Sequence, residues 1–171
     1  MSLARGSGAA KFLYEPEMEI TDLITPGTVI AQLRAASKKQ ALQELAKRAA
    51  AMTGIHERMI YDVLIERERL GTTGIGNGIG IPHGKLSGLT KLYGIFARLE
   101  RPIPFEAIDD QPVDLIFLLL APETAGADHL KALALVSRLL RDRTVCEKLR
   151  GTANPDALYA LLTDHTATHA A

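Results

Sequence analysis

Apolar residues recur at helical spacing in two stretches of the first half of the chain. Between Ser37 and Gly54 the apolar positions fall three and four residues apart, so we predict a helix that Ser37 caps and Gly54 ends. A second stretch, from His56 to Leu70, has similar spacing and is followed directly by Gly71, a residue type common just after a helix. The pattern therefore predicts two successive helices.

Two later stretches are predicted to be strands. Residues 92–99 (LYGIFARL) are mostly apolar, and residues 113–120 (VDLIFLLL) form a continuous apolar run, as expected of a central strand covered on both faces. Further helices are predicted over residues 128–140, 144–149 and 155–162. Because helices flank the strands on both sides in the sequence, we predict an α/β fold. It would be a single domain with a mixed, parallel and antiparallel β-sheet and α-helices on both faces.

The length of the chain and the composition of its ends bound this domain. A chain of 171 residues is long enough for one domain with a substantial core. Residues 1–15 begin with small residues that lack periodicity, and we expect them to be a disordered lead-in. Residues 16–164 are expected to form the domain, and residues 165–171 a frayed tail.

Composition and charge exclude several classes of protein. The formal net charge is zero and there is no Trp, so neither nucleic acid nor an anionic membrane is an expected partner. The apolar run from Leu115 to Ala121 is too short to cross a bilayer. Cys146 is the single cysteine, which excludes a disulfide within the chain and a cysteine-based zinc cluster. We therefore expect a soluble, cytoplasmic protein that needs no metal and no cofactor.

The candidate chemistry lies in a glycine-rich stretch that contains one histidine. Seven of the chain's fourteen glycines fall between Gly71 and Gly88. Glycine is concentrated where the backbone must take unusual angles or come close to another group. Pro82 fixes its own φ, so we expect His83 to be presented from a tightly shaped loop. A neutral imidazole has a lone pair at neutral pH and can act as a nucleophile, a base or a ligand.

Other glycine and histidine motifs do not fit. A Walker motif ends in Gly-Lys-Ser/Thr, whereas this chain has Gly84-Lys85-Leu86, and the spacing of a dinucleotide fingerprint is absent. The pair His56-Glu57 begins like a zinc protease motif, but Ile60 stands where the second histidine ligand would be. The sequence therefore does not favour a nucleotide-binding loop or a metal site.

Two residues outside the glycine-rich stretch are candidates to assist His83. His129 is predicted in the first turn of a helix, where backbone N–H groups favour nearby anions. Arg67 is in the last helical turn before the glycines, within Glu66-Arg67-Glu68-Arg69. A guanidinium can donate two parallel hydrogen bonds to two oxygens of one phosphate. The sequence does not decide whether Arg67 or Arg69 points toward the glycine-rich stretch.

The run Ile-Gly-Asn-Gly-Ile-Gly-Ile-Pro-His-Gly, preceded by Glu-Arg-Glu-Arg-Leu, resembles a known phosphorylation site. It is similar to that of the mannitol/fructose-type EIIA domains of the phosphotransferase system (PTS). Within that family it is most similar to the nitrogen-regulatory branch (IIA-Ntr, PtsN-like). The resemblance extends over about residues 20–162, including the strand at 113–120 and Asp128-His129-Leu130. The chain departs from many relatives at Gly80, where they carry Ala.

The resemblance implies roles for particular residues. His83 would accept a phosphoryl group from the phosphohistidine of a small carrier protein, HPr or its nitrogen-branch paralogue NPr. His129 would be the second active-site histidine, and Arg67 the active-site arginine that stabilises the phosphate. Donors from the glycine-rich loop would support the phosphate, with the candidates Gly76, Asn77, Gly78 and Gly84.

Three functions remain open at this stage. The first is a regulatory phosphocarrier, a phosphotransferase component whose phosphorylation state acts on partner proteins such as a potassium transporter or a sensor kinase. The second is a sugar-specific EIIA that passes its phosphate to a separate EIIB. The third, of another class, is a phosphate- or nucleotide-binding module without covalent chemistry.

Overall fold

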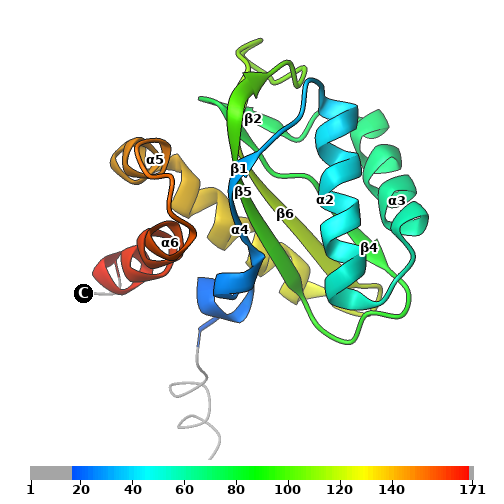
Figure 1. The fold of residues 1–171 in the computed structure, drawn as a ribbon. Helices are drawn as coiled ribbons and strands as arrows, with labels where there is room; N and C mark the ends of the chain where they lie inside the picture. The colour runs from blue at the N-terminus through cyan, green and yellow to red at the C-terminus, as the bar shows by residue number, and fades with distance from the viewer. Residues whose placement is uncertain (1–16, 170–171) are drawn as a thin grey trace, which may run out of the picture.

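Six strands form one mixed sheet in the computed structural model, which describes residues 17–169 (Figure 1). The order along the sheet is β1-β5-β6-β3-β2, and β4 also pairs with β6. β6 is antiparallel to β5 and parallel to β3 and β4, while β1 is parallel to β5. The strands are β1 Val29–Leu33, β2 Gly74–Gly76, β3 Ile79–Gly80, β4 His83–Leu86, β5 Tyr93–Ile103 and β6 Val113–Pro122.

Helices cover both faces of this sheet. The helices α2 and α3 lie on one side, and α4, α5 and α6 lie on the other (Figure 1). Each face has its own cluster of buried apolar residues, and the alternate residues of β6 contribute to both clusters. The bounds are α2 Lys38–Thr53, α3 Glu57–Leu70, α4 Ala127–Arg141, α5 Arg143–Arg150 and α6 Pro155–His169, with 3₁₀ turns η1 Ile20–Asp22 and η2 Pro26–Thr28 before β1.

The predicted fold class and most predicted elements are confirmed. Ser37 caps α2 by accepting a hydrogen bond from the backbone N–H of Gln40, and Gly54 ends the helix with a φ of 76°. β6 is the central strand, buried from Leu115 to its end. α6 continues beyond the expected end at residue 162, as far as His169, and so takes up most of the expected frayed tail. The expected lead-in, residues 1–15, lies outside the described residues.

The glycine-rich stretch differs from the expected loop. It contains three short strands, and His83 is the first residue of one of them. The expectation of a loop histidine is therefore wrong. Strands of two to four residues have too weak a pattern to be predicted. Here β3 and β4 form by pairing with the free side of β6, and β2 forms by pairing with β3. In the described part of the chain, no helix has the length and apolar character needed to cross a membrane.

Candidate functional site

The position of His83 is fixed by strand pairing with β6. In the parallel register of β4 and β6, His83 is opposite Leu119 and Gly84 is opposite Leu120. Among the described strands, β6 is the only partner of β4, so the other side of β4 is a free edge. Successive side chains of a strand point to opposite faces, and Gly84 faces Val63 of α3. His83 therefore points toward the opposite face, where α4 lies.

Two hydrogen bonds set the orientation and the tautomer of the His83 ring. Nδ1 lies 2.8 Å from the carbonyl oxygen of Ile81. Because that oxygen can only accept, Nδ1 carries the proton and Nε2 carries the lone pair. Nε2 accepts a hydrogen bond of 3.2 Å from Nε of Arg67. The half-buried imidazole is thus held as a neutral ring whose Nε2 is available for a nucleophilic attack.

Burial keeps His83 neutral. Burial is the main cause that lowers the pKa of His83 below its ordinary value of 6.5. The bond to Ile81 raises this pKa, the charge of Arg67 lowers it, and the charge of Glu68 raises it. Since the net effect on the pKa is a lowering, the ring has its lone pair at neutral pH.

The structure distinguishes between the two arginines that the sequence left open. Arg67 is half-buried and donates to His83 through Nε and to the carbonyl oxygen of Gly71 through Nη1, at 2.8 Å. Arg69 is exposed and pairs with Glu66 on the surface of the same helix. Arg67 is therefore the arginine that lies in the candidate site.

His129 meets His83 from the first turn of α4. The two ring centroids are 5.7 Å apart, and the ring planes are inclined at 67°. His129 is 7% exposed, and its Nε2 has no hydrogen-bond partner among the described residues. Burial is again the main cause that lowers the pKa of this histidine, with smaller contributions from the charges of His83 and Lys85. A buried ring nitrogen without a partner is able to bond an incoming polar group.

Lys85 is a site residue that the sequence reasoning missed. It follows His83 by two positions in β4 and so points to the same face, and its charge acts on His129. The signal was present in the sequence as this spacing of two, but it has meaning only once residues 83–86 are known to be a strand. Each of the two histidines thus has a positive charge nearby, Arg67 beside His83 and Lys85 beside His129.

The glycines named as phosphate support lie in two different places. Gly84 is next to His83, but its backbone faces Val63 rather than the imidazole. The turn Gly76-Asn77-Gly78 contacts Asp109, Asp114 and Arg150 instead. The β3 strand that follows this turn pairs with Leu115 of β6, four residues from the partner of His83, a separation of about 13 Å along the strand. The structure therefore does not bring this turn to the histidine.

The positive φ angles in this turn explain its glycines in another way. Gly76, Asn77 and Gly78 all have positive φ, at 100°, 56° and 81°. A side chain at 78 would also collide with the carboxylate of Asp114 and the guanidinium of Arg150. The turn is thus shaped to join β2 to β3 beside that ion pair.

Comparison with known proteins places these features in a family. The family model described as the phosphoenolpyruvate-dependent sugar phosphotransferase system, EIIA 2, matches residues 22–165. A nitrogen regulatory protein of Bradyrhizobium diazoefficiens is 58% identical over 153 residues, which cover 90% of this chain and 100% of that protein. The fructose-specific EIIA component of a PTS in Haloferax volcanii is 40% identical over 136 residues, 77% of this chain and 88% of that protein.

A solved structure is also similar throughout the fold. The crystal structure of the nitrogen regulatory protein IIA-Ntr from Neisseria meningitidis superposes with a TM-score of 0.80 at 30% identity. The match covers 84% of this chain and 99% of that one. The sheet and the two helical layers described above are therefore shared with that protein.

Proposed function

Because the chain belongs to the EIIA type 2 family of the phosphoenolpyruvate-dependent sugar phosphotransferase system, we propose that it is a phosphocarrier with a regulatory role. His83 accepts a phosphoryl group at Nε2, and the phosphorylation state changes which partner proteins the chain binds. The observation that carries this proposal is the tautomer of His83, whose proton is held on Nδ1 by Ile81 while Nε2 faces Arg67.

The proposed step exchanges one nitrogen–phosphorus bond for another. The lone pair of His83 Nε2 forms the new N–P bond, and the N–P bond to the donor's imidazole breaks with its electron pair returning to the donor nitrogen. The ring of His83 becomes positive, and Nδ1 keeps its proton and donates a hydrogen bond to the carbonyl oxygen of Ile81, which stabilises that charge. No proton leaves His83 in this step.

Three neighbouring side chains suit the charge of the transferred group. The phosphoryl oxygens bear most of the negative charge during transfer, and positioning with charge stabilisation supplies most of the catalysis of such reactions. As the new N–P bond forms, the N–H groups of Arg67 donate to these oxygens instead of to Nε2 of His83. His129 offers its unpartnered Nε2, and Lys85 contributes positive potential from the same strand.

The proposed donor is a small phosphohistidine carrier of the HPr type, and the nitrogen-branch paralogue NPr is the finer proposal. We place this exchange in the cytoplasm. The name of the B. diazoefficiens relative supports regulation as the output. A potassium transporter or a sensor kinase would be a suitable downstream partner, because the phosphoryl group adds about −1.5 to −2 charges to a surface that another protein could recognise.

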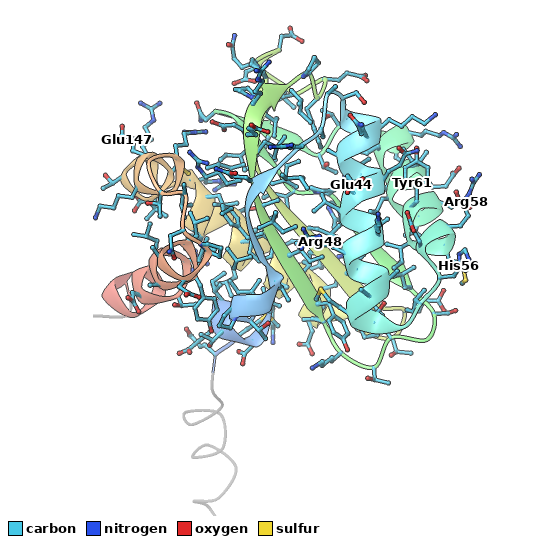
Figure 2. The ribbon with its side chains drawn as sticks, viewed as in Figure 1. Glu44, Arg48, His56, Arg58, Tyr61 and Glu147 are labelled. Atoms are coloured by element: carbon cyan, nitrogen blue, oxygen red, sulfur yellow. The ribbon has the colours of Figure 1, made fainter. Side chains whose placement is uncertain are left out.

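A phosphorylation assay tests this function. The protein is incubated with phosphoenolpyruvate, enzyme I and either HPr or NPr, and nitrogen-15 NMR then identifies the phosphorylated nitrogen. We expect an acid-labile, base-stable phosphate on Nε2 of His83. His83→Ala should remove the label, whereas His56→Asn should keep it, since His56 lies at the outer end of α3 (Figure 2) and Asn preserves its capping role. No label from either carrier would contradict the proposal and leave a non-covalent binding module.

A second candidate function is favoured by the fructose-specific relative. In that case the same phosphorylated His83 would pass its phosphate to a separate EIIB and from there to a sugar. The phosphorylation assay extended with an EIIB and its permease separates the two functions. Sugar phosphate formed at a rate comparable to that of a known sugar-specific EIIA would replace the regulatory proposal with this one.

A further inference from the structure

A buried carboxylate outside the candidate site is connected to His83 by hydrogen bonds. Glu68 follows Arg67 on α3, but its side chain points elsewhere and is only 5% exposed. One carboxylate oxygen lies 2.6 Å from Nζ of Lys38, the first residue of α2. The carboxylate also accepts hydrogen bonds from the hydroxyl and the backbone N–H of Thr73. The carboxylate of Glu68 is therefore buried and is bonded to both Lys38 and Thr73.

The connection continues from Thr73 to the imidazole through a single residue. The carbonyl oxygen of Thr73 accepts a bond of 2.9 Å from the backbone N–H of Ile81. The carbonyl oxygen of Ile81 in turn accepts the bond of 2.8 Å from Nδ1 of His83. Ile81 is thus held at its N–H by Thr73, and it holds the histidine at its carbonyl. An unbroken series of contacts runs from Lys38 through Glu68, Thr73 and Ile81 to His83.

The order of these contacts gives Glu68 a specific effect on the site. The carbonyl of Ile81 selects the tautomer of His83, because a ring nitrogen facing it must carry the proton. The direction of that carbonyl depends on where Thr73 holds the Ile81 N–H. Thr73 is 4% exposed, and its position is set by two bonds to one carboxylate.

We infer that Glu68 and Thr73 are positioning residues that hold His83 in the tautomer with Nε2 free for phosphorylation. This inference rests on the proposed function of His83. Glu68 acts through Thr73 and Ile81 and does not touch the phosphoryl group. Lys38 forms an ion pair with the buried carboxylate, and it also lies over the ring of Phe105, 4.8 Å from its centroid. Arg67 and Glu68, adjacent on α3, thus act on opposite nitrogens of the same ring.

Four variants test the inference. Glu68→Gln removes the negative charge of the side chain to which Lys38 and Thr73 are bonded. Thr73→Val removes the hydroxyl at nearly constant volume, whereas Thr73→Ser retains it. Glu66→Gln is the matched control, because Glu66 is on the same helix but makes an exposed pair with Arg69. Nitrogen-15 NMR of the His83 ring reports its tautomer in each folded variant, and single-turnover phosphorylation reports the rate.

We expect Glu68→Gln and Thr73→Val to give a mixture of His83 tautomers and a rate of phosphorylation about tenfold to a hundredfold lower, as for other misplaced reacting groups. Thr73→Ser and Glu66→Gln should keep the single tautomer and the wild-type rate. A folded Glu68→Gln protein with the wild-type tautomer and rate would overturn the inference. If Glu68→Gln does not fold, the comparison of Thr73→Val with Thr73→Ser tests the inference instead. A wild-type tautomer in Thr73→Val would then overturn the inference.

The NMR measurement also separates this inference from the proposed function. The tautomer is observed without any phosphoryl donor. If the wild-type protein shows the single tautomer but accepts no phosphate, the phosphocarrier proposal fails. The positional effect of Glu68 and Thr73 on the ring is then still tested by their variants.

Discussion

Val63 of α3 packs directly on the backbone of Gly84 in β4. A Cβ at residue 84 would lie 2.4 Å from Cγ1 of Val63, a distance that van der Waals repulsion forbids. The absence of a side chain at 84 therefore sets how closely α3 approaches the strand of His83. Arg67 is one helical turn beyond Val63, so the same contact sets the approach of Arg67 to the imidazole.

Gly84→Ala is expected to push α3 away from β4. Overpacking of this kind costs about 1–3 kcal/mol in the free energy of unfolding. The variant should also slow phosphorylation, because Arg67 no longer reaches His83 at its present distance. Chemical denaturation and single-turnover assays measure the two effects. Val63→Ala in the same chain frees the space, and failure of this double variant to recover stability would contradict the packing explanation.

Arg67→Lys is expected to slow phosphorylation strongly although it preserves the charge. Lysine cannot donate to His83 and Gly71 at once with the planar geometry of a guanidinium. Loss of a donor that stabilises transition-state charge costs about a hundredfold to a thousandfold in rate. The matched variant Arg69→Lys, on the exposed side of α3, should have the wild-type rate. Equal rates for the two variants would show that Arg67 has no special role.

His129→Asn is expected to fold and to accept phosphate more slowly. It replaces the buried ring, whose Nε2 has no partner among the described residues, with a smaller amide, so the cost in stability should be small. Onward transfer to a partner should also slow, since the phosphoryl oxygens lose one donor. Single-turnover rates in both directions measure this, and unchanged rates would exclude a role for His129 in the transfer.

The stability of the protein should fall as the pH decreases below about 6.5. The pKa values of His83 and His129 are both lowered in the folded protein, mainly by burial. The unfolded chain therefore binds more protons than the folded one in the window from 6.5 down through the lowered pKa values, and the free energy of unfolding decreases there. Above that window these two groups contribute no pH dependence.

Denaturation at a series of pH values measures this slope. His129→Asn removes one of the two imidazoles whose pKa is lowered, so its free energy of unfolding should depend less steeply on pH. An identical slope in the wild type and His129→Asn would contradict the assignment.

Arg150→Met is expected to destabilise the fold but to leave the chemistry intact. Arg150 forms two hydrogen bonds with Asp114, at 2.8 and 2.9 Å, and a third to the carbonyl oxygen of Asn77. We expect a loss of about 1–3 kcal/mol, because the partly buried Asp114 loses its partner. The rate of phosphorylation should change little. A large loss of rate in the folded variant would instead support the role in phosphate binding that the sequence indicated for the Gly76-Asn77-Gly78 turn.

The sequence predicts the parts of this molecule that rest on local patterns. The helix from Lys38 was predictable because Ser37 and Gly54 mark its ends. β6 was predictable because its apolar residues follow one another, whereas in a half-exposed strand they alternate with polar residues. The short strands β2, β3 and β4 were not predictable, since each exists only through pairing with another strand. β1 was missed, although it pairs with β5 at the other side of the sheet.

The candidate site divides in the same way. The resemblance drew attention to His83, His129 and Arg67, and the structure brings these three together. The choice between Arg67 and Arg69 depended on how α3 packs, which no local pattern records. The spacing of the glycines predicts one loop, but Gly84 permits a close approach and Gly76 and Gly78 permit positive φ, at different places in the sheet. No local pattern distinguishes Glu68 from the charged residues beside it, because its burial comes from bonds to Lys38 and Thr73.

The strand that begins with His83, β4, has a free edge, and the helices α3 and α4 lie on opposite faces of the sheet (Figure 1). Arg67 of α3 and His129 of α4 both reach the ring of His83. A phosphoryl group on Nε2 would face Arg67 from the first layer and His129 from the second. Charge added to one atom must then be accommodated by both layers at once. We therefore expect phosphorylation of His83 to change the surface charge on both faces of the sheet. Two partners of different shape would then recognise the same phosphorylated histidine, each from its own face of the molecule.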